Sequence, residues 1–292
     1  MIGVDWGTSS FRAFRITPDG RITDRIIMQR GIMTVSDCRF GAVLEQAIGP
    51  WLDDGERHVL LSGMIGSRQG WREAPYLPCP AGPRDLAAAL VAVPFKRAQV
   101  LLVPGLSDTD ETGVPEVMRG EETQIAGALP ELTAESIVCL PGSHSKWVLV
   151  ANGRIMGYRT YLSGEAFAAI RAGTILGRMM ADVPHDPTAF SRGLARAAEP
   201  GHLLHHLFGV RTLALTGRLA ETETASYLSG LLIGHEVAAA LGGAGRVYLV
   251  GGAALTALYA RAILAARATP IILSEDAAAA GLALIGAHAP WT

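Results

Sequence analysis

The chain has 292 residues, a length that suits two domains of ordinary size, and its 49% hydrophobic and 18% charged residues predict packed cores rather than disorder. The formal net charge of −2 argues against a protein that binds nucleic acid through a general basic field. No uncharged apolar stretch reaches the roughly 18 residues of a membrane-spanning helix, and no secretory leader precedes the first apolar segment, so we expect a cytoplasmic globular protein.

The first third of the chain predicts strands separated by glycine turns, together with one amphipathic helix. Apolar residues at helical spacing predict that helix over 40–52. Short apolar or alternating segments predict strands at 2–5, 11–16, 21–28, 58–61 and 99–103. Glycine-containing loops are expected at 62–66 and 104–106. Strands that alternate with helices in this way predict an α/β fold.

The opening pattern returns in the middle of the chain. Ile2 and Gly7 have the same spacing as Ile137 and Gly142, and in both copies a Gly-Arg-Ile turn follows. The repeated unit is a strand, a glycine and hydroxyl turn, a strand, a glycine turn and a strand. We therefore predict two domains of similar topology, each of which presents one such hairpin loop.

The second half of the chain is predicted to be mostly helical. One helix is expected to begin near residue 120. Five more are expected over 164–180, 188–199, 221–241, 255–263 and 275–289. Buried strands are expected at 137–141, 247–250 and 271–273. The domains predicted from this order are 1–119, completed by a C-terminal helix at 276–292, and 120–275.

The strongest candidate site is a carboxylate at the end of a predicted strand, followed by a glycine and hydroxyl residues. Backbone N–H groups of a tight turn form an anion-binding concavity, to which hydroxyl groups add donors. A carboxylate there can hold a hydrated Mg²⁺ ion, which takes few protein ligands. The pattern predicts that Gly7, Thr8 and Ser9 bind phosphate and that Asp5 binds a metal ion, with a plain hairpin turn as the alternative.

A second loop of the same kind supports a phosphate ligand. Gly142, Ser143 and Ser145 supply backbone and hydroxyl donors, and Lys146 supplies a charge that suits a phosphate or a substrate carboxylate. Further on, Gly251-Gly252 joins a predicted strand to a helix without side-chain bulk, which permits close approach of a ribose or a flat ring. A simple tight connection is the alternative there.

Two further segments carry candidate substrate chemistry. Glu121 and Glu122, at a predicted helix start, could accept a proton from a substrate hydroxyl, although helix capping also explains them. The long loop over 63–76 predicts a polar and aromatic pocket for a small hydroxylated anion, with an ordinary surface loop as the alternative. Its candidate binding residues are Gly66, Ser67, Arg68, Trp71 and Tyr76.

Several common sites are not indicated. The chain has no phosphate-loop, dinucleotide-binding, protein-kinase or hydrolase-elbow motif. His202, His205 and His206 share a predicted helix face, but no carboxylate or cysteine pattern accompanies them, which favours a solvated helix over a metal site.

Together these segments resemble the actin, hexokinase and Hsp70 superfamily. Its first phosphate segment matches 5–10, its second matches 142–146 and its adenosine segment matches 247–254, while helices near 121–129 and 276–288 match its connectors. The resemblance implies two ribonuclease H-like domains of actin-like ATPase type, with ATP in a cleft between them.

Within that superfamily the chain resembles the 2-dehydro-3-deoxygalactonokinase family over residues 2–286. The matching stretches are 4–7, 63–77, 117–124, 141–147 and 227–234. The resemblance implies ATP- and Mg²⁺-dependent phosphorylation of the terminal (6-) hydroxyl of 2-dehydro-3-deoxy-D-galactonate in galactonate breakdown.

One departure from related sugar kinases leaves the catalytic base open. Those kinases commonly present an aspartate at the connector, whereas this chain offers Glu121 and Glu122. The residue expected to bind the substrate carboxylate is Arg68 or Lys146. A kinase for another keto-deoxy sugar acid or sugar and an actin- or Hsp70-like binding module are the alternatives. The expected partner is a small sugar acid, without nucleic acid or membrane, and a homodimer is left open.

Overall fold

The computed structural model describes residues 1–292 and places the strands in three sheets. The sheets have the orders β3-β2-β1-β4-β7-β6, β12-β11-β10-β13-β14 and β5-β8-β9. The strands are β1 Ile2–Trp6, β2 Phe11–Ile16, β3 Ile22–Met28, β4 His58–Ser62, β5 Tyr76–Pro78, β6 Val91–Val93, β7 Gln99–Leu102, β8 Gly105–Thr109, β9 Pro115–Met118, β10 Glu135–Leu140, β11 Ser145–Ala151, β12 Arg154–Tyr161, β13 Arg246–Leu249 and β14 Thr269–Ile272.

Nine α-helices accompany these strands. They are α1 Phe40–Asp53, α2 Pro83–Ala88, α3 Glu121–Ala128, α4 Ser163–Gly173, α5 Pro187–Ala197, α6 Leu203–Leu215, α7 Glu221–Ala240, α8 Ala253–Ala265 and α9 Ala277–Gly286. None of them combines the length and the apolar composition that a bilayer span requires.

The chain divides into two compact units. The first contains residues 1–136, 148–158 and 273–292, and the second contains 137–147 and 159–272. The domains predicted from the sequence, 1–119 with 276–292 and 120–275, stay a prediction.

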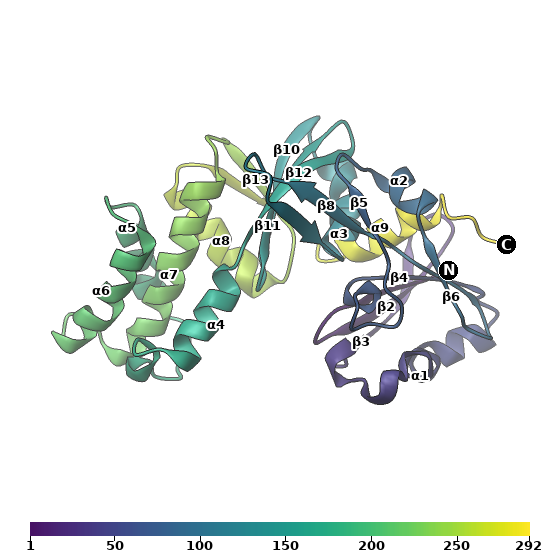
Figure 1. Ribbon diagram of the computed structural model, residues 1–292, viewed down its shortest axis with the longest axis horizontal. Helices are drawn as coiled ribbons and strands as arrows, with labels where there is room; N and C mark the ends of the chain where they lie inside the picture. The colour runs from purple at the N-terminus through teal and green to yellow at the C-terminus, as the bar shows by residue number, and fades with distance from the viewer. The chain divides into compact units, whose positions relative to one another are not determined.

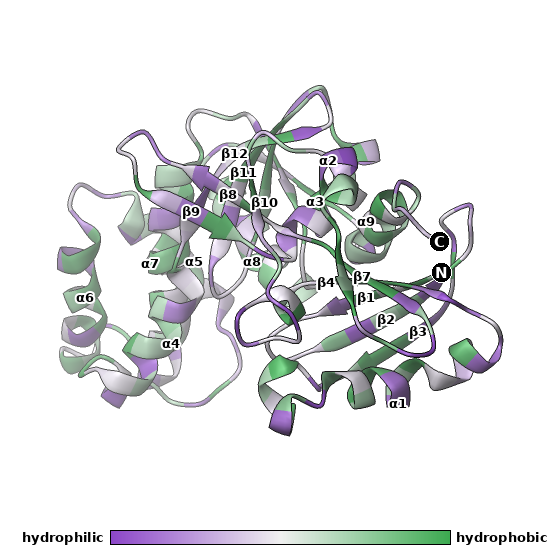
Figure 2. Ribbon diagram, turned by 45° about the vertical axis from the view of Figure 1, so that its right-hand side comes forward, coloured by the Kyte–Doolittle hydropathy of each residue, from purple (hydrophilic) through white to green (hydrophobic).

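In the first unit the six-stranded sheet is built around buried parallel strands. β1 is buried along its whole length and pairs in parallel with β4, which pairs in parallel with β7. Strands covered on both faces need nearly continuous apolar sequences, as β1, β4 and β7 have. Figure 1 shows α1 along one face of this sheet, and Figure 2 shows the apolar character of its central strands.

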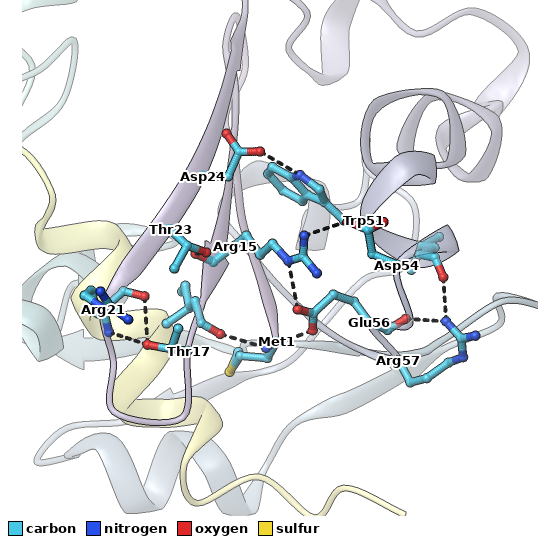
Figure 3. Close-up of polar contacts among 12 residues, drawn as sticks. Met1, Arg15, Thr17, Arg21, Thr23, Asp24, Trp51, Asp54, Glu56 and Arg57 are labelled. Atoms are coloured by element: carbon cyan, nitrogen blue, oxygen red, sulfur yellow. Dashed lines mark hydrogen bonds and ion pairs between the residues drawn. The ribbon is translucent and has the colours of Figure 1, made fainter.

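A polar network fixes the edge of this sheet to the end of α1. Arg15 on β2 donates to Glu56 (3.0 Å) and to Asp54 (2.8 Å), and the indole of Trp51 donates to Asp24 on β3 (3.0 Å; Figure 3). These contacts join residues of the first hairpin to the segment that leads into β4. They therefore hold β2 and β3 against the end of α1, next to the strand that carries Asp5.

The other face of the sheet is covered by α9, which also packs against α3. The two helices approach so closely that a Cβ atom at Gly127 would lie 1.9 Å from the carbonyl oxygen of Ala277, and one at Gly281 would lie 1.8 Å from that of Thr123. Glycine is therefore required at both contacts. This packing fixes the start of α3 relative to the sheet.

The second sheet repeats the strand order of the first. β10, β11 and β12 take the places of β1, β2 and β3, and β13 pairs in parallel with β10 and with β14. The internal repeat predicted from the sequence is therefore confirmed. In the second unit, residues such as Phe190 on α5, Val237 on α7 and Tyr259 on α8 form the buried core with Cys139.

Two predictions of secondary structure were wrong in detail. The helix expected over 164–180 ends at Gly173, because glycine is a weak helix former and Thr174 is already extended, with φ −119° and ψ 169°. The loop expected at 104–106 contains the start of β8, which pairs with β5 and β9. These short, partly polar strands have little apolar periodicity to reveal them.

Candidate functional site

In the first unit, the ends of β1 and β4 bring a carboxylate and a glycine turn together. The two strands are parallel neighbours, with Asp5 opposite Ser62, so their carboxyl ends lie at the same edge of the sheet. Gly63 follows with φ 95°, and a Cβ atom there would lie 2.8 Å from the carbonyl oxygen of Trp6 and 3.2 Å from Oδ1 of Asp5. The turn after β4 therefore passes directly beside the Asp5 carboxylate.

Asp5 is held by one arginine and keeps one oxygen free of hydrogen bonds. Its Oδ2 accepts from Nε of Arg12 at 3.1 Å and pairs closely with Nη2 of the same side chain. Oδ1 accepts no hydrogen bond, and the side chain is 12% exposed. Neither unit gathers three or more His, Cys, Asp or Glu side chains that could hold a metal ion. A single available carboxylate oxygen fits an ion such as Mg²⁺, which keeps most of its water ligands.

The loop after β1 is fixed by its backbone and turns its hydroxyl groups outward. The N–H of Gly7 donates to the carbonyl oxygen of Ser10 (2.9 Å), and the carbonyl oxygens of Gly7 and Thr8 accept from the N–H groups of Ile32 (3.0 Å) and Met33 (3.3 Å). Thr8 and Ser9 are exposed. The predicted phosphate-binding residues of this loop are thus held in place with their side chains accessible.

The start of α3 lies against the same edge. A Cβ atom at Gly120 would lie 3.1 Å from the Cα atom of Gly63. Glu122 is fully buried and accepts from the N–H of Gly120 (2.7 Å) and from the hydroxyl of Thr123 (3.0 Å). The Thr123 hydroxyl also lies 2.6 Å from that of Ser62. Burial, together with the charge of Glu121, raises the pKa of Glu122 to about 8.

The two adjacent glutamates therefore have different environments. Glu121 is half-buried, and its Oε2 accepts from the N–H of Arg119 (3.0 Å). Glu122 has no exposed surface and is bound on both oxygens by its own helix start. Of the two, Glu121 is the one that a substrate can reach.

The loop over 63–76 separates its candidate residues into three environments. Gly66 and Tyr76 contact Arg119, which lies just before α3, and the Tyr76 ring stacks on its guanidinium at 4.3 Å, while Ser67 follows Gly66 in the chain. Trp71 instead packs edge-on against Phe95, at 6.3 Å between ring centroids. The Arg68 side chain is 87% exposed and donates to Glu73 (3.0 Å).

In the second unit, the predicted second loop is braced by the start of α4. The carbonyl oxygen of Ser143 accepts from the N–H of Glu165 (3.0 Å), and the Glu165 carboxylate pairs closely with His144. A Cβ atom at Gly164 would lie 2.5 Å from the carbonyl oxygen of Gly142. Ser143 itself is exposed.

The base of this loop is anchored in a buried network around Glu236 on α7. Its carboxylate accepts from the indole N–H of Trp147 and from the hydroxyl of Tyr259, both at 2.8 Å. The Tyr259 hydroxyl lies 2.7 Å from that of Ser145, which is fully buried. Burial raises the pKa of Glu236, against the opposing effect of these hydrogen bonds. The neighbouring Lys146 is also buried and donates to Thr160 (3.0 Å).

We expect Tyr259→Phe to lower the free energy of unfolding by about 1–2 kcal/mol, because Glu236 and Ser145 would both lose a buried partner. Urea denaturation of both proteins measures this difference. The control is Tyr227→Phe, since the buried ring of Tyr227 forms no hydrogen bond through its hydroxyl. Equal losses in the two variants would show that the network does not stabilise the loop.

A cavity of about 300 Å³ opens beside the second loop, within the second unit. Helices α4, α7 and α8 supply most of its wall, and Gly142 of the loop lies at its edge. The side chains lining it include Phe167, Arg171, His185, Ser229, Leu232, Leu255 and Leu258. Its size and mostly apolar wall suit a flat organic ring.

Gly251-Gly252 lies next to the second loop. Gly251 has φ 148°, and a Cβ atom there would lie 3.7 Å from the carbonyl oxygen of Pro141, while Gly252 is exposed at the start of α8. The sequence pattern missed the cavity-lining residue Phe167, because an apolar residue on a helix looks like ordinary core, and His185, which lies before α5 and belongs to no motif. It also missed Arg119, whose only signal was its place before a glycine at a helix start.

Comparisons with known proteins show the family of the chain. A family model described as 2-keto-3-deoxy-galactonokinase matches residues 5–285. The curated protein named Probable 2-dehydro-3-deoxygalactonokinase DgoK1 from Rhizobium meliloti (strain 1021) is 37% identical over 99% of this chain and 96% of its own length. The 2-dehydro-3-deoxygalactonokinase of Escherichia coli (strain K12) is 32% identical over 90% of this chain and 89% of its own length.

Solved structures match as well. A crystal structure assigned to a 2-dehydro-3-deoxygalactonokinase protein from Sinorhizobium meliloti has a TM-score of 0.90 at 35% identity, covering 98% of this chain and 97% of that one. The activator of 2-hydroxyisocaproyl-CoA dehydratase from Clostridium difficile was solved with bound ADPNP. It has a TM-score of 0.54 at 14% identity, and the match covers 97% of this chain and 92% of that one. The actin-like ATPase fold expected from the sequence is confirmed.

Proposed function

Since this chain belongs to the 2-keto-3-deoxy-galactonokinase family, we propose that it transfers the γ-phosphate of ATP to the terminal 6-hydroxyl of 2-dehydro-3-deoxy-D-galactonate. The identity of 37% over 99% of the chain to a relative named for this activity carries the proposal. The reaction consumes ATP in sugar-acid breakdown, and we therefore expect the protein to act in the cytoplasm. The family match does not favour a kinase for other sugars or an Hsp70-like binding module.

The nucleotide base and ribose occupy the cavity of the second unit. Its apolar side chains contact a flat ring, and the Gly251-Gly252 turn, in which Gly252 is exposed, lets the ribose approach the backbone. Gly142 and Ser143 then lie beside the phosphate end, because Gly142 borders the cavity. Ser145 and Lys146 are buried, so they act by holding this loop and by adding positive charge beneath it.

In the first unit, Gly7, Thr8 and Ser9 supply backbone and hydroxyl donors to phosphate oxygens. Oδ1 of Asp5 carries the metal function, because it lies at the strand end without a hydrogen bond. When bound with ATP, Mg²⁺ neutralises negative charge on the phosphate oxygens and orients them. Arg12 fixes the Asp5 side chain, so its free oxygen has one orientation.

Glu121 accepts or orients the proton of the acceptor hydroxyl. It is the accessible carboxylate at the start of α3, and the N–H of Arg119 fixes one of its oxygens. Glu122 is a positioning residue that holds the turn at Gly120 against Gly63. Gly66, Ser67 and Tyr76 border this position on the substrate side.

A coupled assay of ADP release tests the proposed function. We expect ADP release that depends on 2-dehydro-3-deoxy-D-galactonate, with much weaker signals for other six-carbon keto-deoxy acids and for neutral hexoses. Product analysis by phosphorus NMR should place the phosphate on the terminal hydroxyl. Slow ATP turnover that no sugar acid stimulates would contradict the proposal and favour a binding module. The molar mass measured by light scattering tests whether the protein is a homodimer in solution.

A further inference from the structure

Arg119 carries a buried guanidinium group with unused hydrogen-bond donors. It directly follows β9 and is 8% exposed. Its Nη2 donates to the carbonyl oxygen of Ala74 (2.7 Å), whereas Nε and Nη1 have no hydrogen-bond partner. A buried charge without an opposite charge costs considerable free energy. The structure therefore keeps a cationic group whose pairing is incomplete within the protein itself.

The surroundings of Arg119 hold the guanidinium in a defined plane. The Tyr76 ring covers one face at 4.3 Å. That ring is in turn fixed against Gly105, where a Cβ atom would lie 2.6 Å from it. At Gly66 a Cβ atom would lie 2.9 Å from Nη1, so the absence of a side chain at this residue lets its main chain pass close to the guanidinium. The Oγ of the next residue, Ser67, is also buried without a partner.

This group lies beside the proposed catalytic residues of the first unit. The N–H of Arg119 donates to Glu121, and the next residue, Gly120, packs on Gly63. Gly63 in turn lies beside Asp5. Two nitrogen atoms of the Arg119 guanidinium therefore have no partner beside the position assigned to the acceptor sugar, and the unpartnered hydroxyl of Ser67 follows Gly66, which contacts that guanidinium. Their chemistry suits an anionic oxygen of that sugar.

We propose that Arg119, with Ser67, binds the carboxylate of the sugar-acid substrate. The inference rests on the proposed function, because it names the residues that recognise the acid group. A carboxylate completes the charge pairing of Arg119, and hydrogen bonds between ions are the strongest of their kind. A neutral hexose would leave the guanidinium unpaired, which gives discrimination against sugars without the acid group.

Arg68 is a weaker candidate for this role. It is exposed and already pairs with Glu73. An ion pair at such a solvated position contributes little binding free energy. The Arg119 guanidinium is buried and forms no ion pair with a carboxylate of the protein, so its attraction to a substrate carboxylate is much stronger.

The test compares the acid substrate with its uncharged 1-amide in the wild type, Arg119→Met and Arg119→Lys. We expect Arg119→Met to lower kcat/KM for the acid on the order of 10²-fold, mainly through KM, and to leave the amide nearly unchanged. Arg119→Lys should recover part of the loss for the acid. The matched control is Arg72→Met, since Arg72 is an exposed arginine of the loop over 63–76 that also donates to a backbone carbonyl. It should behave as the wild type.

The outcomes separate this inference from the proposed function. If the wild type phosphorylates the acid but Arg119→Met loses acid and amide equally, Arg119 has a structural role and the inference is wrong. A loss confined to Arg68→Met or Lys146→Met would also overturn it. If the wild type phosphorylates neither compound, the proposed function fails, and thermal stabilisation of the wild type by the acid but not the amide still tests carboxylate binding. Should Arg119→Met not fold, the same comparison with Arg119→Lys decides.

Discussion

Glu121→Gln is expected to lower kcat by about 10²- to 10⁴-fold, the contribution of a positioned general base, while both substrates still bind. Glutamine keeps the shape of the side chain and can still accept from the N–H of Arg119, so the start of α3 stays in place. What is lost is the basic carboxylate oxygen to which we assign the proton of the acceptor hydroxyl. Steady-state kinetics by coupled ADP release and calorimetric titration of ATP measure the two quantities separately.

Glu122→Gln is the matched control, because it makes the same chemical change one residue away. Its amide oxygen can accept from the N–H of Gly120, and its amide group can donate to the hydroxyl of Thr123. With the pKa of Glu122 raised to about 8, the wild-type side chain is already mostly neutral at pH 7. We therefore expect near-wild-type turnover from this variant. A large loss in Glu122→Gln with full activity in Glu121→Gln would reverse the assignment.

The raised pKa of Glu122 also predicts how stability depends on pH. In the unfolded chain this carboxyl group loses its proton near its ordinary pKa of 4.5, whereas in the folded protein it keeps the proton until about pH 8. The folded state therefore binds more protons between these values, and the free energy of unfolding falls as pH rises through that window. Glu122→Gln has no carboxyl group to titrate at this position. As pH rises from 4.5 to about 9, its free energy of unfolding should therefore increase by roughly 3–5 kcal/mol relative to that of the wild type. Urea denaturation at several pH values measures the difference, and parallel curves for the two proteins would contradict it.

The parts of the site that could be predicted from the sequence are those whose chemistry is local. Asp5 and the Gly7 turn follow one another at the end of an apolar strand, and the same order at Gly142 revealed the repeat. Such strand and turn patterns depend on residues close together in the chain. The strand order around β1, which returns around β10, confirms the internal repeat, whereas the roles of Asp5 and the Gly7 turn stay predictions.

The rest depends on packing between distant segments. Glu122 and Glu121 are equivalent in the sequence, and only the contacts of Gly120 with Gly63 and of Thr123 with Ser62 make one of them buried. Arg119 became a candidate only when Tyr76 and Gly66 were found around it. Contacts of this kind leave no periodic pattern in the chain. That the two phosphate-binding loops act on one nucleotide stays a prediction.

Asp5→Asn is expected to lower kcat on the order of 10³-fold without loss of the fold. Asparagine can still accept a hydrogen bond from Arg12, whose side chain is 32% exposed, so the strand end keeps its main contact. The variant removes the negative charge from the oxygen beside Gly63. A neutral amide oxygen is a much poorer ligand than a carboxylate for a small divalent cation.

Three measurements check the role of Asp5. Kinetics over a range of Mg²⁺ concentrations should show a weaker apparent affinity for the metal in Asp5→Asn, and thermal unfolding should show a midpoint close to that of the wild type. The control is Asp24→Asn, which removes a carboxylate of the same hairpin that contacts Trp51 rather than the strand end. It should keep normal Mg²⁺ dependence even if it loses some stability. Turnover near the wild-type rate in Asp5→Asn, with the same Mg²⁺ dependence, would mean that this carboxylate serves only to hold Arg12, and the metal would have to be assigned to other groups.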